Sequence, residues 1–167
     1  MSVDVRAITV KPPWSWAIAH GQKLVENRSQ GTSYRGTLLI HAGKAWSARG
    51  GHDPRVVAAW VATGWPAAWI ADQAVARLPL GAVVAVAQLV DSHPDAGCCR
   101  PWGESSYAEA GGRVRTAVHH LVLEDVVPLT EPIPARGALG LWRPPSDLAA
   151  ACASASAMPD PQPGGTR

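Results

Sequence analysis

The sequence predicts a single domain of the α+β class, and three observations support this. Residues 8–42 alternate short β-branched runs with one helical segment, which indicates strands and helices mixed along the chain. Residues 82–91 are apolar on both faces, as expected of a strand in the middle of a sheet. With 167 residues, of which 47% are hydrophobic, the chain has the size and composition of one globular domain.

The first predicted elements are a strand and a helix. Residues 6–10 are apolar and β-branched, which predicts a buried strand. Pro12 and Pro13 can open the helix, because a proline in the first turn loses no needed hydrogen bond. Gly21 is expected to end this helix in a left-handed conformation. The spacing i, i+3, i+4 gives the helix one apolar face, formed by Trp14, Ala17 and Ile18.

Two further strands complete the N-terminal part. A strand over 24–28 has the period-two geometry that puts Glu26 and Arg28 on the same side. After a turn, a strand over 37–42 directs His41 to the face opposite its apolar residues. These strands therefore bring charged and titratable side chains into a small region of the sheet.

Residues 43–77 are predicted to form a loop over 43–53 and two helices, over 54–62 and 66–77. Tryptophans at helical spacing usually belong to a core rather than to a binding surface. We therefore expect these helices to pack onto the sheet through Trp60, Trp65 and Trp69.

The central strand over 82–91 is followed by a loop over 94–113 that is rich in Gly, Pro and Cys. Loops of this length are often functional, or simple insertions. Strand character returns over 114–127, where His119 and His120 point to opposite faces.

The last predicted elements are a turn over 128–135, a strand over 136–143 and a closing helix over 147–152. We expect the domain to comprise residues 1–152. Residues 153–167 are mostly small residues, Pro and Gly, a composition typical of a disordered tail.

Net charge and cysteine content limit the partners and cellular compartments that we expect for the protein. The net charge of +2 is too small to indicate a polyanionic partner by itself, so any basic groove must arise from local arrangement. The sequence has no recognisable signal peptide and no apolar run long enough to cross a membrane. Three cysteines, two of them adjacent, do not resemble a secreted disulfide framework. We expect a cytoplasmic protein, and nothing in the sequence demands more than a monomer.

Several spaced motifs resemble the ASCH family, the activating-signal-cointegrator homology domain. They are VKPPWSWAIAHGQKLVENR, YRGTLLIHA, LPLGAVVAVAQLVDSH, VHHLVLEDVVPL and IPARGALGLWRPP, which together span about residues 5–148. The family resembles PUA and YTH-like domains. The resemblance thus implies a small mixed β-barrel with short flanking helices around a charged cleft.

A PUA-like, ASCH-type barrel implies a domain that binds nucleic acid, RNA more than DNA, or a modified nucleoside. Lysine and arginine in such a cleft hold phosphate oxygens, and an aromatic side chain can stack a base. Trp16 is the preferred stacking residue because it lies off the apolar helix face. In the alternative interpretation, Glu26 and Arg28 form an ion pair that only stabilises a strand. The candidate ligand-binding residues are Lys11, Trp16, Arg28, Tyr34, Arg35, Asp91 and His119, with Lys23 as a further phosphate contact.

Relatives with this fold include ribonucleases and an amidohydrolase that acts on N4-acetylcytidine, so a hydrolase is the main alternative. The amidohydrolase pattern has a lysine followed three residues later by a threonine nucleophile. Lys23 matches, but position 26 is glutamate, which cannot replace an acylated hydroxyl. A metal-independent ribonuclease needs a base, an acid and a cation, and the candidate catalytic residues are Lys23, Glu26 and His41. A protein-interaction module of a transcription or translation complex is a third possibility.

No cofactor or metal is predicted. His93, Cys98 and Cys99 are metal-ligand types, but zinc sites favour cysteines two to four residues apart, and adjacent cysteines fit that spacing poorly. We expect Cys98 and Cys99 to pack the base of the 94–113 loop under Trp102. Asp91 and His93 emerge at the end of the central strand, where such residues often cap a loop.

Overall fold

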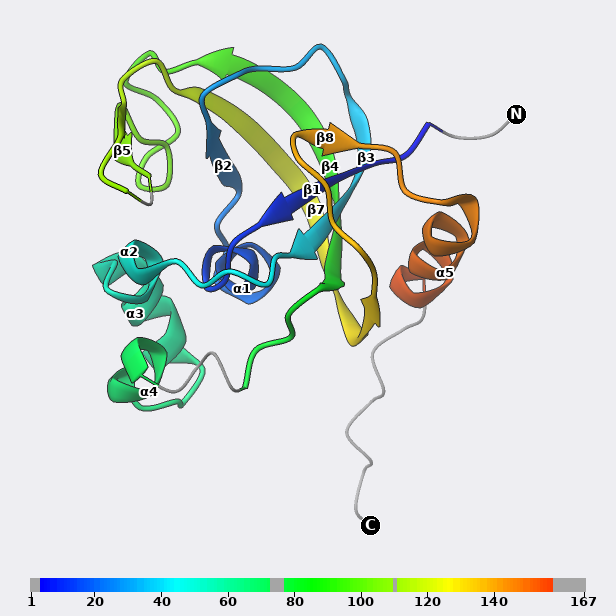
Figure 1. Cartoon of the computed structure of the whole chain (residues 1–167), viewed down its shortest axis with the longest axis horizontal. Coiled ribbons are helices and arrows are strands. Elements are labelled where there is room, and N and C mark those ends of the chain that lie inside the picture. Colours follow the sequence, from blue (N-terminus) through cyan, green and yellow to red (C-terminus); the bar gives the residue numbers. More distant parts are fainter. Residues whose placement is uncertain (1–3, 73–76, 110, 158–167) are drawn as a thin grey trace.

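The computed structural model describes residues 4–72, 77–109 and 111–157, and it is built around one curled six-stranded sheet (Figure 1). The strands follow the spatial order β2-β7-β4-β3-β1-β8. Their bounds are β1 Arg6–Val10, β2 Val25–Arg28, β3 Gly36–Ala42, β4 Ala82–Pro94, β7 His119–Pro134 and β8 Leu141–Trp142. The sheet is a half-barrel, and the fold is of the α+β class.

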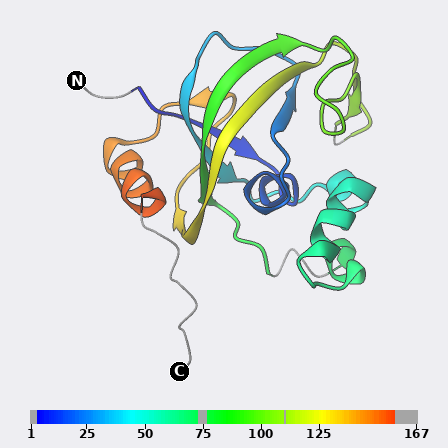
Figure 2. The same ribbon diagram turned by 180° about the vertical axis from the view of Figure 1, so that it is seen from behind.

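Strand pairing makes the sheet mixed. β1 runs parallel to β3, and the other neighbouring pairs, β1–β8, β2–β7, β3–β4 and β4–β7, are antiparallel. β4 and β7 are the longest strands and arch side by side across the molecule (Figure 2). Their pairing contains three register shifts, and such bulges bend strands and increase their twist. The bending allows the sheet to curl around a core.

The sheet buries both of its faces because its strands alternate apolar side chains between them. Ile8 and Leu38 belong to the main core, together with the first helix. Ala7 and Leu39, their neighbours in sequence, belong to a second core on the other face. β4 lies in the middle of the sheet, as its continuous apolar sequence predicted.

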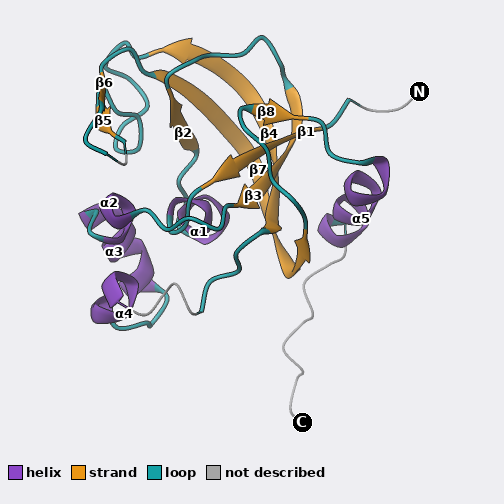
Figure 3. Ribbon diagram, in the orientation of Figure 1, coloured by secondary structure: helices purple, strands orange, loops and turns teal. Residues whose placement is uncertain are grey.

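Five helices accompany the sheet in the described residues, α1 to α4 on one side and α5 on the other (Figure 3). α1 closes the main core with Trp14, Ala17 and Ile18, the predicted apolar face. α5 covers the second core with Leu148 and Cys152. The bounds are α1 Trp14–His20, α2 Ala48–Gly51, α3 Pro54–Ala62, α4 Ala67–Asp72 and α5 Ser146–Ser156.

The predicted strand over 6–10 and the helix over 54–62 are confirmed at both ends. The predicted turn over 128–135 is wrong, because β7 continues to Pro134. β2 pairs with β7 only up to Val122, so Pro128 lies where β7 has a free edge. A proline is tolerated on such an edge, since its missing N–H costs no ladder hydrogen bond there.

Three local predictions are also corrected. Gly21 ends α1 with a φ of −104°, and the left-handed conformation belongs to the next residue, Gln22. The predicted loop over 43–53 contains α2, which Ser47 caps by accepting a hydrogen bond from the Gly50 N–H. The predicted strand over 136–143 is reduced to β8.

The remaining expectations fall partly outside the described residues. The second helix of the predicted pair is described only over α4, and the side chain of Trp69 is not described. Trp60 is buried in the main core as predicted, whereas Trp65 is 42% exposed. α5 extends beyond the predicted end at residue 152, and residues 158–167 of the predicted tail lie outside the described part. No helix among the described residues has the length and apolar character needed to span a bilayer.

Candidate nucleic-acid interface

A cleft of about 530 Å³ opens where β1 and β2 end. Its other walls come from the loop after β3, the loop that carries the short strand β5 (Tyr107–Ala108), and residues 138–140 before β8. β5 pairs with β6 (Val114–Arg115) in a separate two-stranded sheet. The polar and aromatic lining residues are Thr9, Lys11, Trp14, Glu26, Asn27, Arg28, Lys44, Ser47, Arg49, Tyr107 and Glu109.

A buried charge network forms the back wall of the cleft. Lys23 Nζ donates to Glu26 Oε2 over 3.0 Å, and Arg28 Nε donates to Glu26 Oε1 over 3.1 Å. Arg28 also donates to the Thr9 carbonyl oxygen over 2.7 Å, which fixes β2 against the end of β1. The same-side placement of Glu26 and Arg28 is confirmed, and both carboxylate oxygens are occupied.

This network keeps Glu26 ionised. Burial favours the neutral acid, but the charges of Lys23 and Arg28 and the hydrogen bonds from both hold the pKa of Glu26 below its ordinary value. Lys23 is 2% exposed and does not line the cleft. It therefore acts on the cleft through Glu26 rather than by touching its contents.

Trp14 forms an aromatic part of the wall. Its indole N–H donates to Ser47 Oγ over 3.0 Å. Because Ser47 is the N-cap of α2, this hydrogen bond links α1 to the start of α2 beside the cleft. The Arg49 guanidinium lies 4.7 Å from the centre of the indole ring, a cation–π distance, and 5.8 Å from the Tyr107 ring. Both carboxylate oxygens of Glu104 accept hydrogen bonds from Arg49 over 3.1 Å. Arg49 is thus held near two aromatic rings by an acid.

The cleft has an excess of positive charge. Four cations line it, Lys11, Arg28, Lys44 and Arg49, against the two carboxylates Glu26 and Glu109. The side chains of Lys11 and Lys44 are exposed and, within the described part of the chain, make no side-chain hydrogen bond and no direct ion pair. The charge of Lys11 acts on Glu109 at longer range and contributes to the lowered pKa of that carboxyl. The ammonium groups of Lys11 and Lys44 are therefore available to a ligand.

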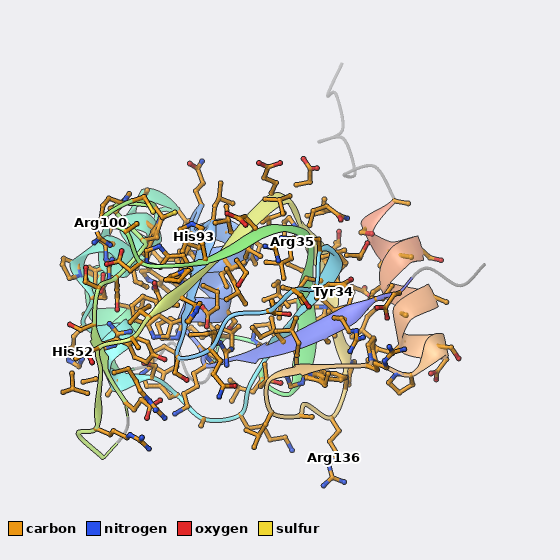
Figure 4. All side chains as sticks on the ribbon, turned by 90° about the horizontal axis from the view of Figure 1, so that it is seen from above. Tyr34, Arg35, His52, His93, Arg100 and Arg136 are labelled. Carbon is orange, nitrogen blue, oxygen red and sulfur yellow. The ribbon has the colours of Figure 1, made fainter. Side chains whose placement is uncertain are left out.

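Of the predicted ligand-binding residues, Lys11 and Arg28 line this cleft and the other five do not. Trp16 packs edge-on against Trp60, with 4.9 Å between ring centres, so it belongs beside the core. Arg35, which follows Tyr34 just before β3 (Figure 4), donates to Asp91 Oδ1 over 2.9 Å in an exposed ion pair. Tyr34 packs on the main core, and its hydroxyl oxygen lies 2.8 Å from the Asp4 carbonyl oxygen and 2.7 Å from that of Thr37. His119 lies against Gly31.

His41 lines a neighbouring cavity of about 830 Å³, which shares Thr9, Gly43, Lys44, Ala138 and Leu139 with the first cleft. Its Nε2 lies 2.9 Å from the Ala135 carbonyl oxygen, and its ring packs edge-on against Trp142. Of the predicted catalytic set, only Glu26 lines the first cleft; Lys23 stands behind it and His41 beside the second cavity.

Sequence analysis did not select Lys44, Arg49, Tyr107 or Glu109, all of which line the cleft. Lys44 and Arg49 were visible as charges in the loop after β3, and Tyr107 lies in the long loop expected to be functional or inserted. No local pattern joins these segments. Only the fold brings the long loop across to the end of β2, through hydrogen bonds of Asn27 with the Trp102 carbonyl and the Glu104 N–H.

The cysteines lie outside the cleft, and all three are free thiols. Cys152 is on the buried face of α5, Cys98 is exposed and Cys99 is partly buried. The predicted cover by Trp102 differs from the arrangement found, since the Trp102 ring lies under the Arg55 guanidinium at 5.3 Å and Cys98 remains open to solvent.

Comparison with known proteins places the fold in a family. The family model described as "ASCH domain" matches residues 8–125. No curated protein matches the chain. Among solved structures, the chain is similar to ASCH from Zymomonas mobilis, with a TM-score of 0.53 and 14% identity over 90% of this chain and 94% of the other.

Two variants of that Zymomonas mobilis protein match equally well. One carries phenylalanine in place of a tyrosine, with a TM-score of 0.51 and 14% identity over 91% of this chain and 98% of the other. The other carries alanine in place of a serine, with a TM-score of 0.52 and 14% identity over 90% and 95%. At this identity the structures support the fold alone, whereas the family model covers most of the chain. The protein therefore belongs to the ASCH domain family.

Proposed function

We propose that the cleft binds single-stranded RNA or a modified nucleoside. The observation that carries this proposal is the arrangement of cations around an aromatic wall. Two ammonium groups without a direct ion pair, those of Lys11 and Lys44, line the cleft together with Trp14, Tyr107 and the guanidinium of Arg49.

Each part of the cleft has a role in this proposal. Lys11 and Lys44 neutralise phosphate oxygens, which provide most of the affinity for nucleic acid. Bases stack on aromatic rings or on arginine planes, so the Arg49–Tyr107 side of the cleft receives one unstacked base. A volume of about 530 Å³ suits a ligand the size of a nucleoside rather than a duplex.

Hydrolysis of RNA is the alternative, and the Glu26 network weighs against it. A general base must be free to accept a proton from the attacking group. Both Glu26 oxygens accept hydrogen bonds from cations, and its lowered pKa makes it a weak base. His41 lines the neighbouring cavity rather than this cleft, its Nε2 faces the Ala135 carbonyl oxygen, and Lys23 is buried against Glu26. Binding without turnover is therefore the function that the arrangement favours.

The salt dependence of RNA binding tests the proposal. Fluorescence anisotropy of a labelled single-stranded RNA is measured over a series of salt concentrations, with single-stranded DNA of the same sequence in parallel. Each phosphate contact lowers the slope of log affinity against log salt by about 0.7 for a single strand. Lys11→Ala and Lys44→Ala are each expected to weaken binding and to make the slope shallower by about that amount.

Arg143→Ala provides the matched control. Arg143 is 72% exposed at its side chain, pairs with Asp4 and does not line the cleft. Its loss is expected to leave both affinity and slope unchanged. RNA binding that is absent in the wild type, independent of salt, or weakened equally by Arg143→Ala would overturn the proposal. A protein-interaction module becomes the next hypothesis in the first two cases.

A further inference from the structure

Two histidines and two cysteines meet at the end of the β4–β7 arch. His93 on β4 and His120 on β7 are direct cross-strand partners, with 5.4 Å between their ring centres. Cys98 and Cys99 come from the loop that follows β4. One ligand atom from each of these four residues lies within 4.8 Å of the other three.

The adjacent cysteines converge because the backbone turns between them. Cys99 has a φ of +63°, in the left-handed region, which keeps its side chain from pointing away from that of Cys98 as it would in an extended strand. Their Sγ atoms are 3.7 Å apart. The chain packs closely here, since a Cβ on Gly103 would come within 2.8 Å of both Cys99 Cβ and His120 Cε1.

Backbone carbonyls prepare both imidazoles as ligands. His93 Nδ1 lies 2.8 Å from the Pro94 carbonyl oxygen, which places the proton on Nδ1 and leaves the Nε2 lone pair free, 3.5 Å from Cys99 Sγ. His120 Nε2 lies 3.0 Å from the Glu104 carbonyl oxygen, which leaves the lone pair on Nδ1. His120 is fully buried, and its Nδ1 has no hydrogen-bond partner among the described residues.

Two of the separations within this cluster match those of a tetrahedral zinc site. Bonds of about 2.3 Å to sulfur and 2.0–2.1 Å to nitrogen at tetrahedral angles put two sulfur ligands about 3.8 Å apart and a sulfur and a nitrogen about 3.5 Å apart. The observed distances are 3.7 Å between the two sulfurs and 3.5 Å between Cys99 Sγ and His93 Nε2. Two thiolates with two imidazoles are a donor set typical of zinc.

We propose that His93, Cys98, Cys99 and His120 bind one Zn²⁺ ion as a structural site. Binding forms two zinc–sulfur and two zinc–nitrogen bonds, and the protons of both thiols pass to solvent. Two thiolates balance the charge of the ion, so no net charge is added beside the buried His120. The backbone carbonyls of Pro94 and Glu104 act as the outer shell that orients the imidazoles.

The site is placed to fix one wall of the cleft. The Glu104 carbonyl holds His120, while the Glu104 carboxylate holds Arg49 and also Arg55, whose Nη2 lies 2.6 Å away. Tyr107 follows three residues later on the same loop and lines the cleft. Zinc would therefore stiffen the segment that carries Glu104 and Tyr107, whatever the ligand of the cleft proves to be.

Zinc titration of the full chain tests the site directly. The protein is reduced, freed of metal with a chelator and titrated with Zn²⁺ against a chromogenic competitor, and Co²⁺ is used as a spectroscopic probe. We expect one Zn²⁺ per chain, and for Co²⁺ the visible absorption of a tetrahedral site with thiolate charge transfer. Cys98→Ala removes an exposed ligand without disturbing the core, and it is expected to weaken zinc binding by about 100-fold or more, beyond the 10–100-fold cost of losing an outer-shell partner.

Cys152→Ala is the matched control, because it removes the one thiol outside the cluster. This variant is expected to keep the stoichiometry, the affinity and the cobalt spectrum of the wild type. Circular dichroism verifies that each variant is folded. A folded wild type that binds no zinc, or that binds it no more tightly than Cys98→Ala, overturns the proposal, as does an octahedral cobalt spectrum without thiolate charge transfer.

Discussion

The ammonium group of Lys23 lies 3.0 Å from Glu26 Oε2, and both side chains are almost completely buried, with 3% and 12% exposure. Arg28 completes the network from the cleft side. A buried pair of this kind contributes little net stability when intact, but removing one partner leaves an uncompensated charge. The pair therefore makes the chain sensitive to substitution and to pH at the same place.

Lys23→Met is expected to destabilise the protein by about 3 kcal/mol, the lower end for breaking a buried pair, because Arg28 still faces Glu26. Methionine keeps the length of the side chain, so the loss reports the charge rather than a cavity. Urea unfolding at neutral pH measures this loss in the free energy of unfolding. Arg143→Ala, which removes an exposed partner of Asp4, is expected to cost no more than about 1 kcal/mol. Equal losses in the two variants would contradict this account of the buried pair.

Glu26 also predicts how stability changes with pH. The pKa of Glu26 in the folded protein lies below its ordinary value of 4.5. Between the lowered pKa and the ordinary pKa, the folded state therefore binds fewer protons than the unfolded state. The stabilisation is fully present above the ordinary pKa and is lost as the pH falls through the lowered pKa. Urea unfolding between about pH 6 and pH 3 should show this loss in the wild type. Glu26→Gln should be less stable at neutral pH and show a flatter profile, and parallel profiles would refute the assignment.

Gly137→Ala is expected to displace the loop between the two cavities. A Cβ there would lie 2.6 Å from both His41 Cε1 and Thr9 Oγ1. The imidazole cannot easily move, since its Nε2 lies 2.9 Å from the Ala135 carbonyl oxygen. Overpacking of this kind costs about 1–3 kcal/mol, measurable by urea unfolding, and should also weaken RNA binding. Ala150→Ser, at an exposed position on α5 that lines neither cavity, should change neither stability nor RNA binding, so a similar loss there would point to another cause.

The wild-type protein is expected to leave single-stranded RNA intact in the presence of EDTA. The physical reason is that both Glu26 oxygens are engaged by Lys23 and Arg28, so no free base faces the cleft from this position. Gel electrophoresis of end-labelled RNA after incubation provides the measurement. Cleavage that persists in EDTA and disappears in Glu26→Gln would instead identify a metal-independent ribonuclease.

The local sequence predicted the bounds of an element correctly where features within that element determine them. β1 follows from its β-branched run and has the expected bounds. α3 also has the expected bounds, and in the structure the Asp53 carboxylate caps it by accepting a hydrogen bond from the Arg55 N–H. The turn predicted at Pro128 was wrong because the effect of a proline depends on whether a neighbouring strand pairs with the chain at that position. A proline ends a central strand, but β2 stops short of this position, so β7 passes through it as an edge. Neighbouring strands are a property of the tertiary fold.

The residues of the candidate cleft also divide into those that the local sequence predicted and those that only the fold brings together. Period-two geometry was enough to pair Glu26 with Arg28, because both lie on one strand. Trp16, Tyr34 and Arg35 are close to that strand in sequence, yet they do not line the cleft. Arg49 and Tyr107 are 58 positions apart and meet only because the long loop folds back over the end of β2.

The sequence by itself determined the mixed α+β class, the family, the central position of β4 and the charged face of β2, since each follows from periodicity or from a contiguous motif. Tertiary structure decided which charges share the cleft and which cysteines and histidines meet. Adjacent cysteines had suggested packing rather than metal binding, because a spacing rule assumes ligands on a regular backbone. The left-handed turn at Cys99 and the cross-strand pairing of His93 with His120 bring the four side chains together, and neither can be read from local spacing.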